Sequence, residues 1–155
     1  MAVIATQPEL KKSRSACPEE ATFLELLRTT DLLSRQLSEV LKAEELSSNQ
    51  YNVLRILRGS PEGMPCGEIG QRMITRDPDI TRLLDRLEKR NLISRSRDTR
   101  DRRTVMARIT PEGMDLLERT DEPVRQTHTK QLGHLGPERL QALNELLQVA
   151  REQAG

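Results

Sequence analysis

The segment from Asp77 to Ile109 constrains the fold of this chain more strongly than any other. It opens with Asp-Pro-Asp, in which Asp77 suits the N-cap of an α-helix and Pro78 suits its first turn. The apolar residues that follow recur at spacings i, i+3, i+4 and i+7, namely Ile80, Leu83, Leu84 and Leu87. We therefore expect a helix over residues 77–90 that begins at Asp77, buries one face and exposes the other.

Two segments with a different period follow this helix directly. Residues 92–97 and 104–109 alternate apolar and polar side chains, which is typical of half-buried β-strands. The six residues between them, 98–103, include five charged ones and indicate a hairpin tip. Two short helices joined by a turn and followed by a basic hairpin together predict a winged helix-turn-helix.

The rest of the chain is predicted to be helical. A Ser-x-x-Gln capping box at Ser47 begins one helix, and we expect Gly59 to end it in the left-handed conformation. Pro123 is expected to interrupt the fifth helix. The predicted helices cover residues 18–43, 47–58, 67–73, 77–90, 110–132 and 136–153. The predicted fold is thus mainly α with a small β-hairpin wing, in the order ααααββαα.

Length and composition suit one helical domain. The chain has 155 residues and only one Phe and one Tyr, so its core must consist mainly of leucine with other aliphatic residues. Residues 1–16 show no apolar period, and we expect a disordered arm there, followed by a single domain over residues 17–155. No apolar run is long enough to cross a bilayer and the N-terminal residues lack the pattern of a signal peptide, so we expect a cytoplasmic protein.

The net charge of +1 conceals an uneven distribution along the chain. Residues 72–108 contain twelve Arg or Lys against six Asp or Glu, a net charge of +6. Residues 18–71 carry −4 and residues 109–155 carry −3. A phosphate backbone would be attracted to the middle segment alone, which lies in the lobe predicted for residues 47–109.

The cations of this segment lie where DNA grooves could receive them. An α-helix fits the major groove, where Arg donates two hydrogen bonds to guanine and Thr meets a thymine methyl group or a phosphate. The negative potential of a narrow minor groove attracts the arginines of a protruding hairpin. We therefore expect double-stranded DNA as the partner. The predicted DNA-binding residues are Arg76, Thr81, Arg82, Arg86, Arg100, Arg102 and Arg103.

Two simpler interpretations remain open for the same side chains. Asp85 and Glu88 could pair with the cations of a solvated helix face, which is the commoner role of such charges. Asp98 and Asp101 alternate with the arginines of the tip and could neutralise them in an ordinary surface hairpin.

The run ITRDPDITRLLDRLEKRNLISRSRDTRDRRTVMARITPEG combines a recognition helix, an Asp-x-x-Asp-Arg-Arg wing and a Thr-Pro-Glu-Gly helix start in this order. Through this run, and more broadly over residues 23–147, the chain resembles the MarR-type regulators. The resemblance implies that Asp101 braces the hairpin and that Arg103 enters the minor groove. For Arg102, in the same tip, we expect contact with a phosphate. Asn91 stands where the family often has Gly, between helix and wing.

The resemblance also implies how such a protein acts. The first, fifth and sixth helices, about residues 18–43, 110–132 and 136–153, would form a two-fold dimer on a pseudo-palindromic operator. The protein would act as a repressor, and a small aromatic or phenolic effector would bind in a cleft between the dimer helices and the lobe. A helical adaptor that binds another protein through its leucine-rich terminal helices, without DNA, remains an alternative.

We expect neither an enzyme nor a cofactor. The chain has no glycine-rich phosphate loop, no nucleophile elbow and no HExxH motif. Cys17 and Cys66 lack a basic neighbour in sequence and are interpreted as inert thiols. His128 and His134, six residues apart, are interpreted as surface residues and not as metal ligands.

Overall fold

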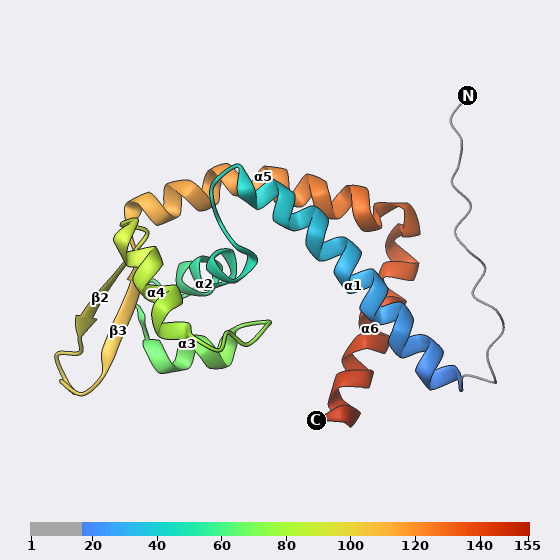
Figure 1. The fold of residues 1–155 in the computed structure, drawn as a ribbon, viewed down its shortest axis with the longest axis horizontal. Helices are drawn as coiled ribbons and strands as arrows, with labels where there is room; N and C mark the ends of the chain where they lie inside the picture. Colours follow the sequence, from blue (N-terminus) through green and yellow to red (C-terminus); the bar gives the residue numbers. More distant parts are fainter. Residues whose placement is uncertain (1–16) are drawn as a thin grey trace. The chain divides into compact units, whose positions relative to one another are not determined.

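A computed structural model describes residues 17–155, and the predicted arm at residues 1–16 lies outside the described residues. The elements are α1 (Pro18–Lys42), α2 (Ser48–Arg58), β1 (Met64–Pro65), α3 (Cys66–Arg72), α4 (Ile80–Lys89), β2 (Ile93–Arg97), β3 (Val105–Ile109), α5 (Pro111–Leu132), the 3-10 turn η1 (Gly133–Leu135) and α6 (Gly136–Ala154) (Figure 1). The chain divides between Ser34 and Arg35 into two units, each described by itself.

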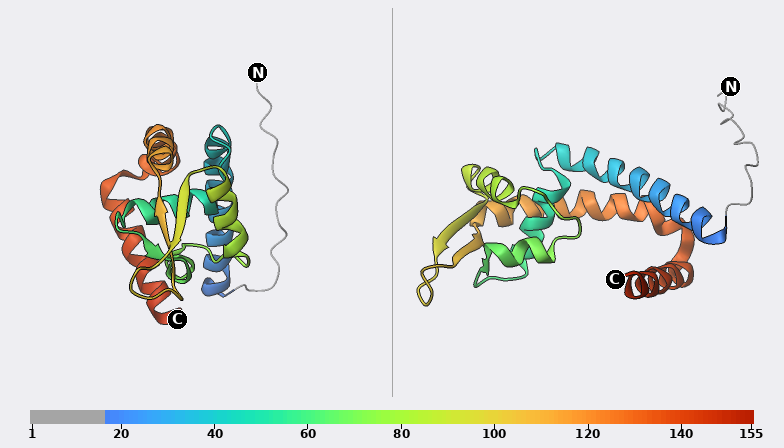
Figure 2. Two further views of the ribbon diagram at one scale, coloured as in Figure 1. Left: turned by 90° about the vertical axis from the view of Figure 1, so that its left-hand side faces the viewer. Right: turned by 60° about the horizontal axis from the view of Figure 1, so that its bottom comes forward.

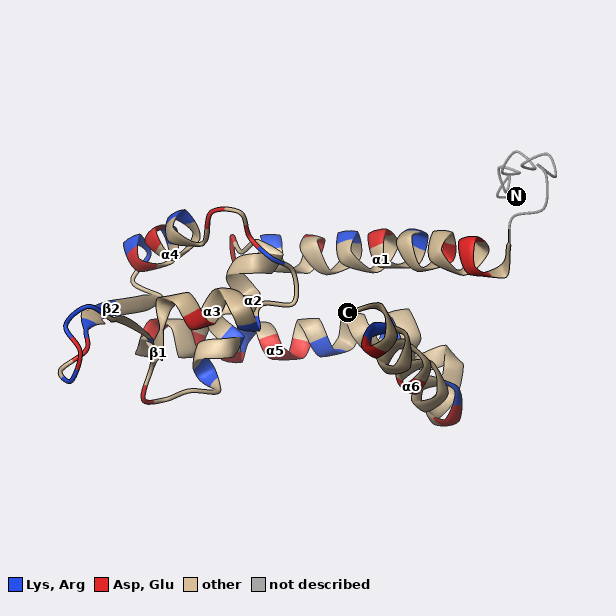
Figure 3. Ribbon diagram, turned by 90° about the horizontal axis from the view of Figure 1, so that it is seen from below, with Lys and Arg blue, Asp and Glu red and all other residues tan. Residues whose placement is uncertain are grey.

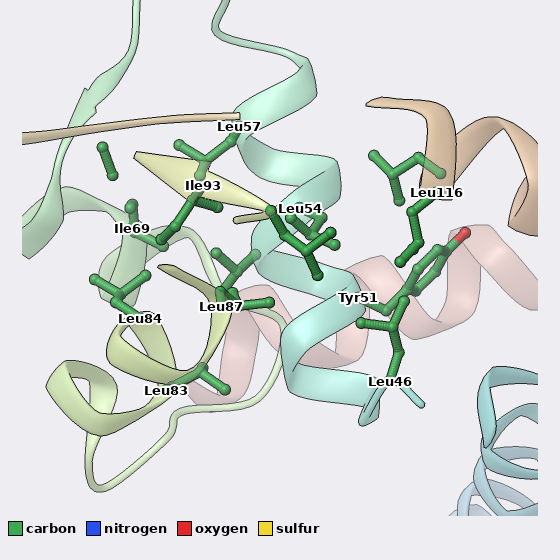
Figure 4. Close-up of a cluster of buried hydrophobic side chains, with 14 of the residues drawn as sticks. Leu46, Tyr51, Leu54, Leu57, Ile69, Leu83, Leu84, Leu87, Ile93 and Leu116 are labelled. Carbon is green, nitrogen blue, oxygen red and sulfur yellow. The ribbon is translucent and has the colours of Figure 1, made fainter. Parts of the chain in front are cut away.

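The hydrophobic core lies in the unit that begins at Arg35. It is formed by α2, α3, α4, the sheet and the first part of α5, together with the last turn of α1 (Figure 4). Its fully buried side chains include Leu41, Val53, Leu54, Leu57, Ile69, Leu87 and Leu117. Burial of a Leu or Ile side chain contributes about 1.5–3 kcal/mol, so these aliphatic residues are the main source of stability for the lobe.

The capping box at the start of α2 is confirmed. The hydroxyl of Ser47 accepts a hydrogen bond from the Gln50 amide at 3.1 Å, and the Gln50 side chain accepts one from the Ser47 amide at 3.0 Å. The helix ends at Arg58 as predicted, but the reason was wrong, because Gly59 is right-handed with φ −74°. Gly63 takes the left-handed conformation instead, at φ +88°, and a Cβ there would lie 2.9 Å from the carbonyl oxygen of Ala107.

The chain approaches Ala107 closely at Gly63 because the next residue begins β1, a strand that the sequence analysis missed. The sheet has three antiparallel strands in the order β1-β3-β2, and Met64 of β1 pairs with Ala107 of β3. The sequence analysis predicted no strand between residues 59 and 65, because two residues are too few to show an alternating pattern. The hairpin of β2 and β3 has Ile93 opposite Ile109 and Arg97 opposite Val105, and it projects from the helices around it (Figure 2).

The start of α4 differs from the prediction by two residues. Asp79, and not Asp77, is the N-cap, and its carboxylate accepts a hydrogen bond from the amide of Arg82 at 3.0 Å. Asp77 instead accepts hydrogen bonds from the Asn49 side chain and from the Asp79 amide, both at 2.9 Å. Because its carboxylate is held by α2, Asp77 stays outside the helix.

The predicted interruption at Pro123 was also wrong, since α5 is continuous from Pro111 to Leu132. Pro123 is exposed, whereas Thr120 and Val124 beside it are buried. Packing of that buried face holds the helix through a residue that removes one backbone hydrogen bond. None of the helices formed by residues 17–155 is long and apolar enough to span a membrane.

Candidate nucleic-acid interface

A helix, a turn and a second helix form the first part of the candidate interface. The buried face of α4 packs Leu83, Leu84 and Leu87 into the lobe. Its other face exposes Thr81, Arg82, Arg86 and Lys89. Figure 3 shows that basic residues lie along α4 and around the tip of the β2–β3 hairpin. The apolar period of the sequence therefore predicted correctly which face of α4 is free.

The turn between α3 and α4 is held by two asparagines of α2. The side-chain oxygen of Asn52 accepts a hydrogen bond from the Ile74 amide at 2.9 Å, and Asn49 donates to Asp77 at the same distance. Arg76 lies between these anchors with its side chain exposed. The pKa of Asp77 is lowered, first by the hydrogen bond from the Asp79 amide and then by the one from Asn49. Sequence analysis missed both asparagines.

Among the residues that the structure describes, only one of the three cations on the exposed face of α4 is paired with an acidic residue of its own helix. Arg82 has one acidic neighbour, with its Nε 3.7 Å from Asp79, and its side chain is 70% exposed. Arg86 and Lys89 form no ion pair with any residue in the range 17–155. The alternative in which Asp85 and Glu88 pair with these cations is therefore not what the structure shows.

Asp85 and Glu88 bind a residue of the wing instead. Nη2 of Arg95, on β2, donates to Asp85 at 2.5 Å and to Glu88 at 2.6 Å, and its Nε donates to Glu88 at 3.0 Å. Only 22% of the Arg95 side chain is exposed. The alternation of residues 92–97 predicted the strand, but it carried no signal for this pairing.

Hydrogen bonds within the tip define the shape of the wing, residues 93–109. Asp101 accepts hydrogen bonds from the Arg103 amide at 3.0 Å and from the Thr104 hydroxyl at 3.3 Å. Arg97, which the sequence analysis did not single out, donates to the Arg102 carbonyl at 2.7 Å. The tip arginines, Arg100, Arg102 and Arg103, are exposed and form no ion pair within the described part of the chain. Their guanidinium groups face water.

The base of the wing is fixed by the chain on both sides of it. Asn91, before β2, has φ +56°, in the left-handed region that Asn tolerates better than most residues. After β3, Thr110 caps α5 by accepting from the Gly113 amide at 3.1 Å and donates its hydroxyl proton to the Asn91 carbonyl at 2.6 Å. A Cβ at Gly113 would overlap the Leu92 carbonyl. The ends of β2 and β3 are therefore held next to the start of α5.

A cleft of about 580 Å³ lies elsewhere in the same unit, between α2, α5 and the start of α6. Arg55 stacks over Tyr51 with its guanidinium carbon 5.8 Å from the ring centroid. Arg58 donates to Asp121 at 2.7 Å, a hydrogen bond that raises the pKa of Arg58. Apolar walls come from Val124, Leu132 and Leu140. The cleft thus combines cations, one aromatic ring and aliphatic surface.

The two cysteines and two histidines are not among the exposed basic residues of α4 and the wing. Burial raises the pKa of the Cys66 thiol, which disfavours the reactive thiolate, and Cys17 is exposed. His128 and His134 are exposed as predicted, and His128 lines the cleft. Residues 17–155 contain no group of three side chains that could hold a metal ion.

A helix-turn-helix whose second helix exposes a basic face, followed by an antiparallel basic hairpin, defines a winged helix-turn-helix protein. The family model described as "MarR family" matches residues 46–105, which span α2 to the start of β3. A MarR transcription factor from Planctomyces limnophilus is 42% identical, with a TM-score of 0.67 over 88% of this chain and 99% of that one. The chain belongs to the MarR family of transcription regulators, and it is therefore not an enzyme.

Two further relatives agree with this assignment. The homoprotocatechuate degradative operon repressor of Escherichia coli is 25% identical over 83% of this chain and 86% of its own length. The transcriptional repressor CouR, in a structure bound to a 23-mer DNA duplex, is 26% identical with a TM-score of 0.72, over 87% of this chain and 92% of that one. Binding of DNA to regulate transcription is the activity of this family.

Proposed function

We propose that the protein is a transcriptional repressor that binds a pseudo-palindromic operator as a homodimer. Each protomer would place α4 in the major groove and the wing in the adjacent minor groove. The observation that carries this proposal is the exposed cationic surface that α4 and the tip share. Within the described residues, Arg82 pairs with Asp79, and the other cations of this surface form no ion pair. CouR bound to a DNA duplex supports the same use of the fold. We place this action in the cytoplasm, with the DNA.

The exposed side chains receive separate roles in this proposal. Arg82 and Thr81, near the N-terminus of α4, would contact base edges, and Arg86, further along the same face, a phosphate or base. Arg76, before the helix, and Arg102, in the tip, would contact phosphates. Arg103 would enter the minor groove and Arg100 would lie beside it, while Asp101 would hold the loop through the hydrogen bonds already described.

The homodimer is supported by apolar surface that one chain leaves exposed. No residue of α6 is buried, and Leu143, Leu146 and Val149 are 38%, 69% and 57% exposed. In α1, Phe23 is 58% and Leu27 53% exposed. Apolar surface of this kind marks protein interfaces, and two-fold dimers are the commonest oligomers. A second copy of this chain would cover it.

Selection of duplexes from a random-sequence library by the purified protein tests the proposal directly. We expect enrichment of an inverted repeat, and binding to it that weakens steeply as salt concentration rises. Sedimentation should report a dimer at micromolar concentration. A folded monomer with no salt-sensitive affinity for duplex DNA would refute the repressor and favour the helical adaptor.

We further propose that the cleft between α2, α5 and α6 receives a small aromatic or phenolic acid that weakens operator binding. Because Arg58 is already paired with Asp121, Arg55 would meet the carboxylate, while Tyr51 and the aliphatic wall would contact the ring. The test titrates 4-hydroxybenzoate against the protein–operator complex. The site is supported if the compound releases DNA from the wild type and from Arg139→Gln but not from Arg55→Gln. Equal release by both variants would exclude it.

A further inference from the structure

Arg95 is the most heavily paired cation on the wing, and its pairs all lie on α4. Its side chain makes three hydrogen bonds to Asp85 and Glu88, and its backbone amide donates a fourth to the other carboxylate oxygen of Glu88 at 3.0 Å. The same guanidinium nitrogen, Nη2, donates to both acidic residues. Side chain and backbone of one strand residue are thus bound to the same helix.

These hydrogen bonds restrain the rotation of α4 relative to the wing as well as the distance between them. Asp85 and Glu88 are three residues apart, so they lie on the same face of α4 on successive turns. A planar guanidinium that bridges both carboxylates resists rotation of the helix about its own axis. Because Arg95 pairs with Ala107 in the hairpin register, the restraint passes to both strands of the wing.

We infer that Arg95 is a positioning residue that sets the angle between the recognition helix α4 and the wing, and that it does so without contacting DNA. The inference rests on the proposed use of both elements on the operator. Two adjacent grooves can be read at once only if helix and hairpin keep a fixed geometry. A covalent link of a few residues between α4 and β2 does not by itself determine that geometry.

The pairing also changes the charge that DNA meets. Asp85 and Glu88 belong to the most basic segment of the chain, and unpaired carboxylates there would repel phosphates. Arg95 offsets one of these two negative charges, and Arg95 itself is no longer among the exposed cations. The pKa of Arg95 is raised, chiefly by its hydrogen bond to Glu88, so the cation is retained.

Replacement of Glu88 by Gln distinguishes a positioning role from simple electrostatics, because the two predict opposite changes in affinity for the operator. If only charge mattered, removal of a carboxylate near DNA would strengthen binding to any duplex. If Glu88 positions the wing through Arg95, Glu88→Gln weakens binding to the selected inverted repeat by about tenfold, or 1.4 kcal/mol. Affinity for a random duplex of the same length stays equal or rises.

Arg95→Lys and Arg95→Gln complete the test. Both lose the bridging guanidinium and should lower the ratio of operator to random affinity to a similar extent, although lysine keeps the charge. Arg108→Gln is the matched control, because it removes the same charge from β3. Within residues 17–155 the Arg108 side chain makes a single hydrogen bond, 3.3 Å long, to the Ser96 hydroxyl. Thermal melting of each variant, performed without DNA, identifies any that fails to fold.

Hydroxyl-radical footprints provide a measurement that should stay unchanged if Arg95 only stabilises the fold. The wild type should protect the minor groove at each flank of the repeat, and the Arg95 and Glu88 variants should lose this flanking protection while the central protection by α4 persists. An unchanged affinity ratio and footprint in folded Glu88→Gln and Arg95→Lys would overturn the inference. Flanks unprotected already in the wild type would instead refute the proposed use of the wing, and the inference with it.

Discussion

The lobe and the terminal helix α6 use leucine in opposite ways. Leu54 and Leu57 of the lobe are completely buried by residues of the same chain. Leu146 of α6 is 69% exposed, and no residue of that helix is buried. Leucines therefore form a buried core in the lobe and an exposed apolar surface on α6.

The difference indicates what each region needs in order to be stable. The lobe carries its own core and presents its charged surface to a ligand, so its stability should not depend on protein concentration. The leucines of α6 gain burial only against another molecule, so their contribution should depend on concentration. Substitutions that act in one region and not in the other can test this contrast.

The largest effect is expected in the core of the lobe. Leu54→Ala removes a completely buried side chain of α2 and should lower the free energy of unfolding by about 2–5 kcal/mol. Leu146→Ala should change it by only about 0.5 kcal/mol in dilute protein, while it raises the dimer dissociation constant. Urea unfolding at two protein concentrations measures both. Equal losses at both positions, independent of concentration, would remove the contrast.

A smaller effect is expected at the major-groove face of the lobe. Arg82→Ala should reduce the preference for the selected repeat over random DNA by about 1–3 kcal/mol, because one bidentate base contact is lost. Thr81→Ala should have a milder effect. Arg151→Ala in α6 removes the same charge and serves as the control. If Arg82→Ala weakens both DNAs equally, Arg82 contacts only phosphate.

Substitutions at two nearby positions of the wing, 101 and 103, should weaken DNA binding in different ways. Arg103→Ala should weaken operator binding and reduce the salt-dependence slope by about one unit, with little change in melting temperature. Asp101→Ala should loosen the tip, since two hydrogen bonds to Asp101 side-chain oxygens are lost, and should lower affinity with nearly the wild-type slope. Binding by Arg103→Ala that matches the wild type at every salt concentration would show that the wing does not read DNA.

The smallest effect concerns pH. Because its pKa is lower in the folded lobe, ionised Asp77 stabilises the fold above its ordinary pKa of about 3.9, and this stability is lost as pH falls through the folded value. Asp77→Asn should therefore melt with a weaker dependence on pH below about pH 4. Melting curves at several acidic pH values measure the change, with Glu152→Gln in α6 as the control. An identical pH dependence in wild type and Asp77→Asn would contradict it.

Much of the interface followed from local patterns. The spacing of Leu83, Leu84 and Leu87 identified the buried face of α4 and hence the exposed positions of Arg82 and Arg86, since both depend only on the helical repeat. Alternation in residues 92–97 and 104–109 identified the two long strands of the sheet, to within one residue at each boundary.

Two of the departures involve partners that are distant in sequence. Asp77 is displaced from the helix by Asn49, 28 residues earlier, and β1 exists only because β3 pairs with it. Pro123 does not interrupt α5, because buried neighbours hold the helix. At each of these positions, tertiary contacts contribute more free energy than the local conformational preference of the residue.

The sequence by itself determined the order of the helices, the hairpin and the location of the basic surface, because these depend on backbone repeats and charges within a few residues. Only the tertiary structure decided that Asp85 and Glu88 bind Arg95 and that Arg55 lines a cleft with residues of α5 and α6. Acidic residues on a helix have several cations within reach along the chain. Which one they bind is decided when the packed strand brings a guanidinium to them at hydrogen-bond distance.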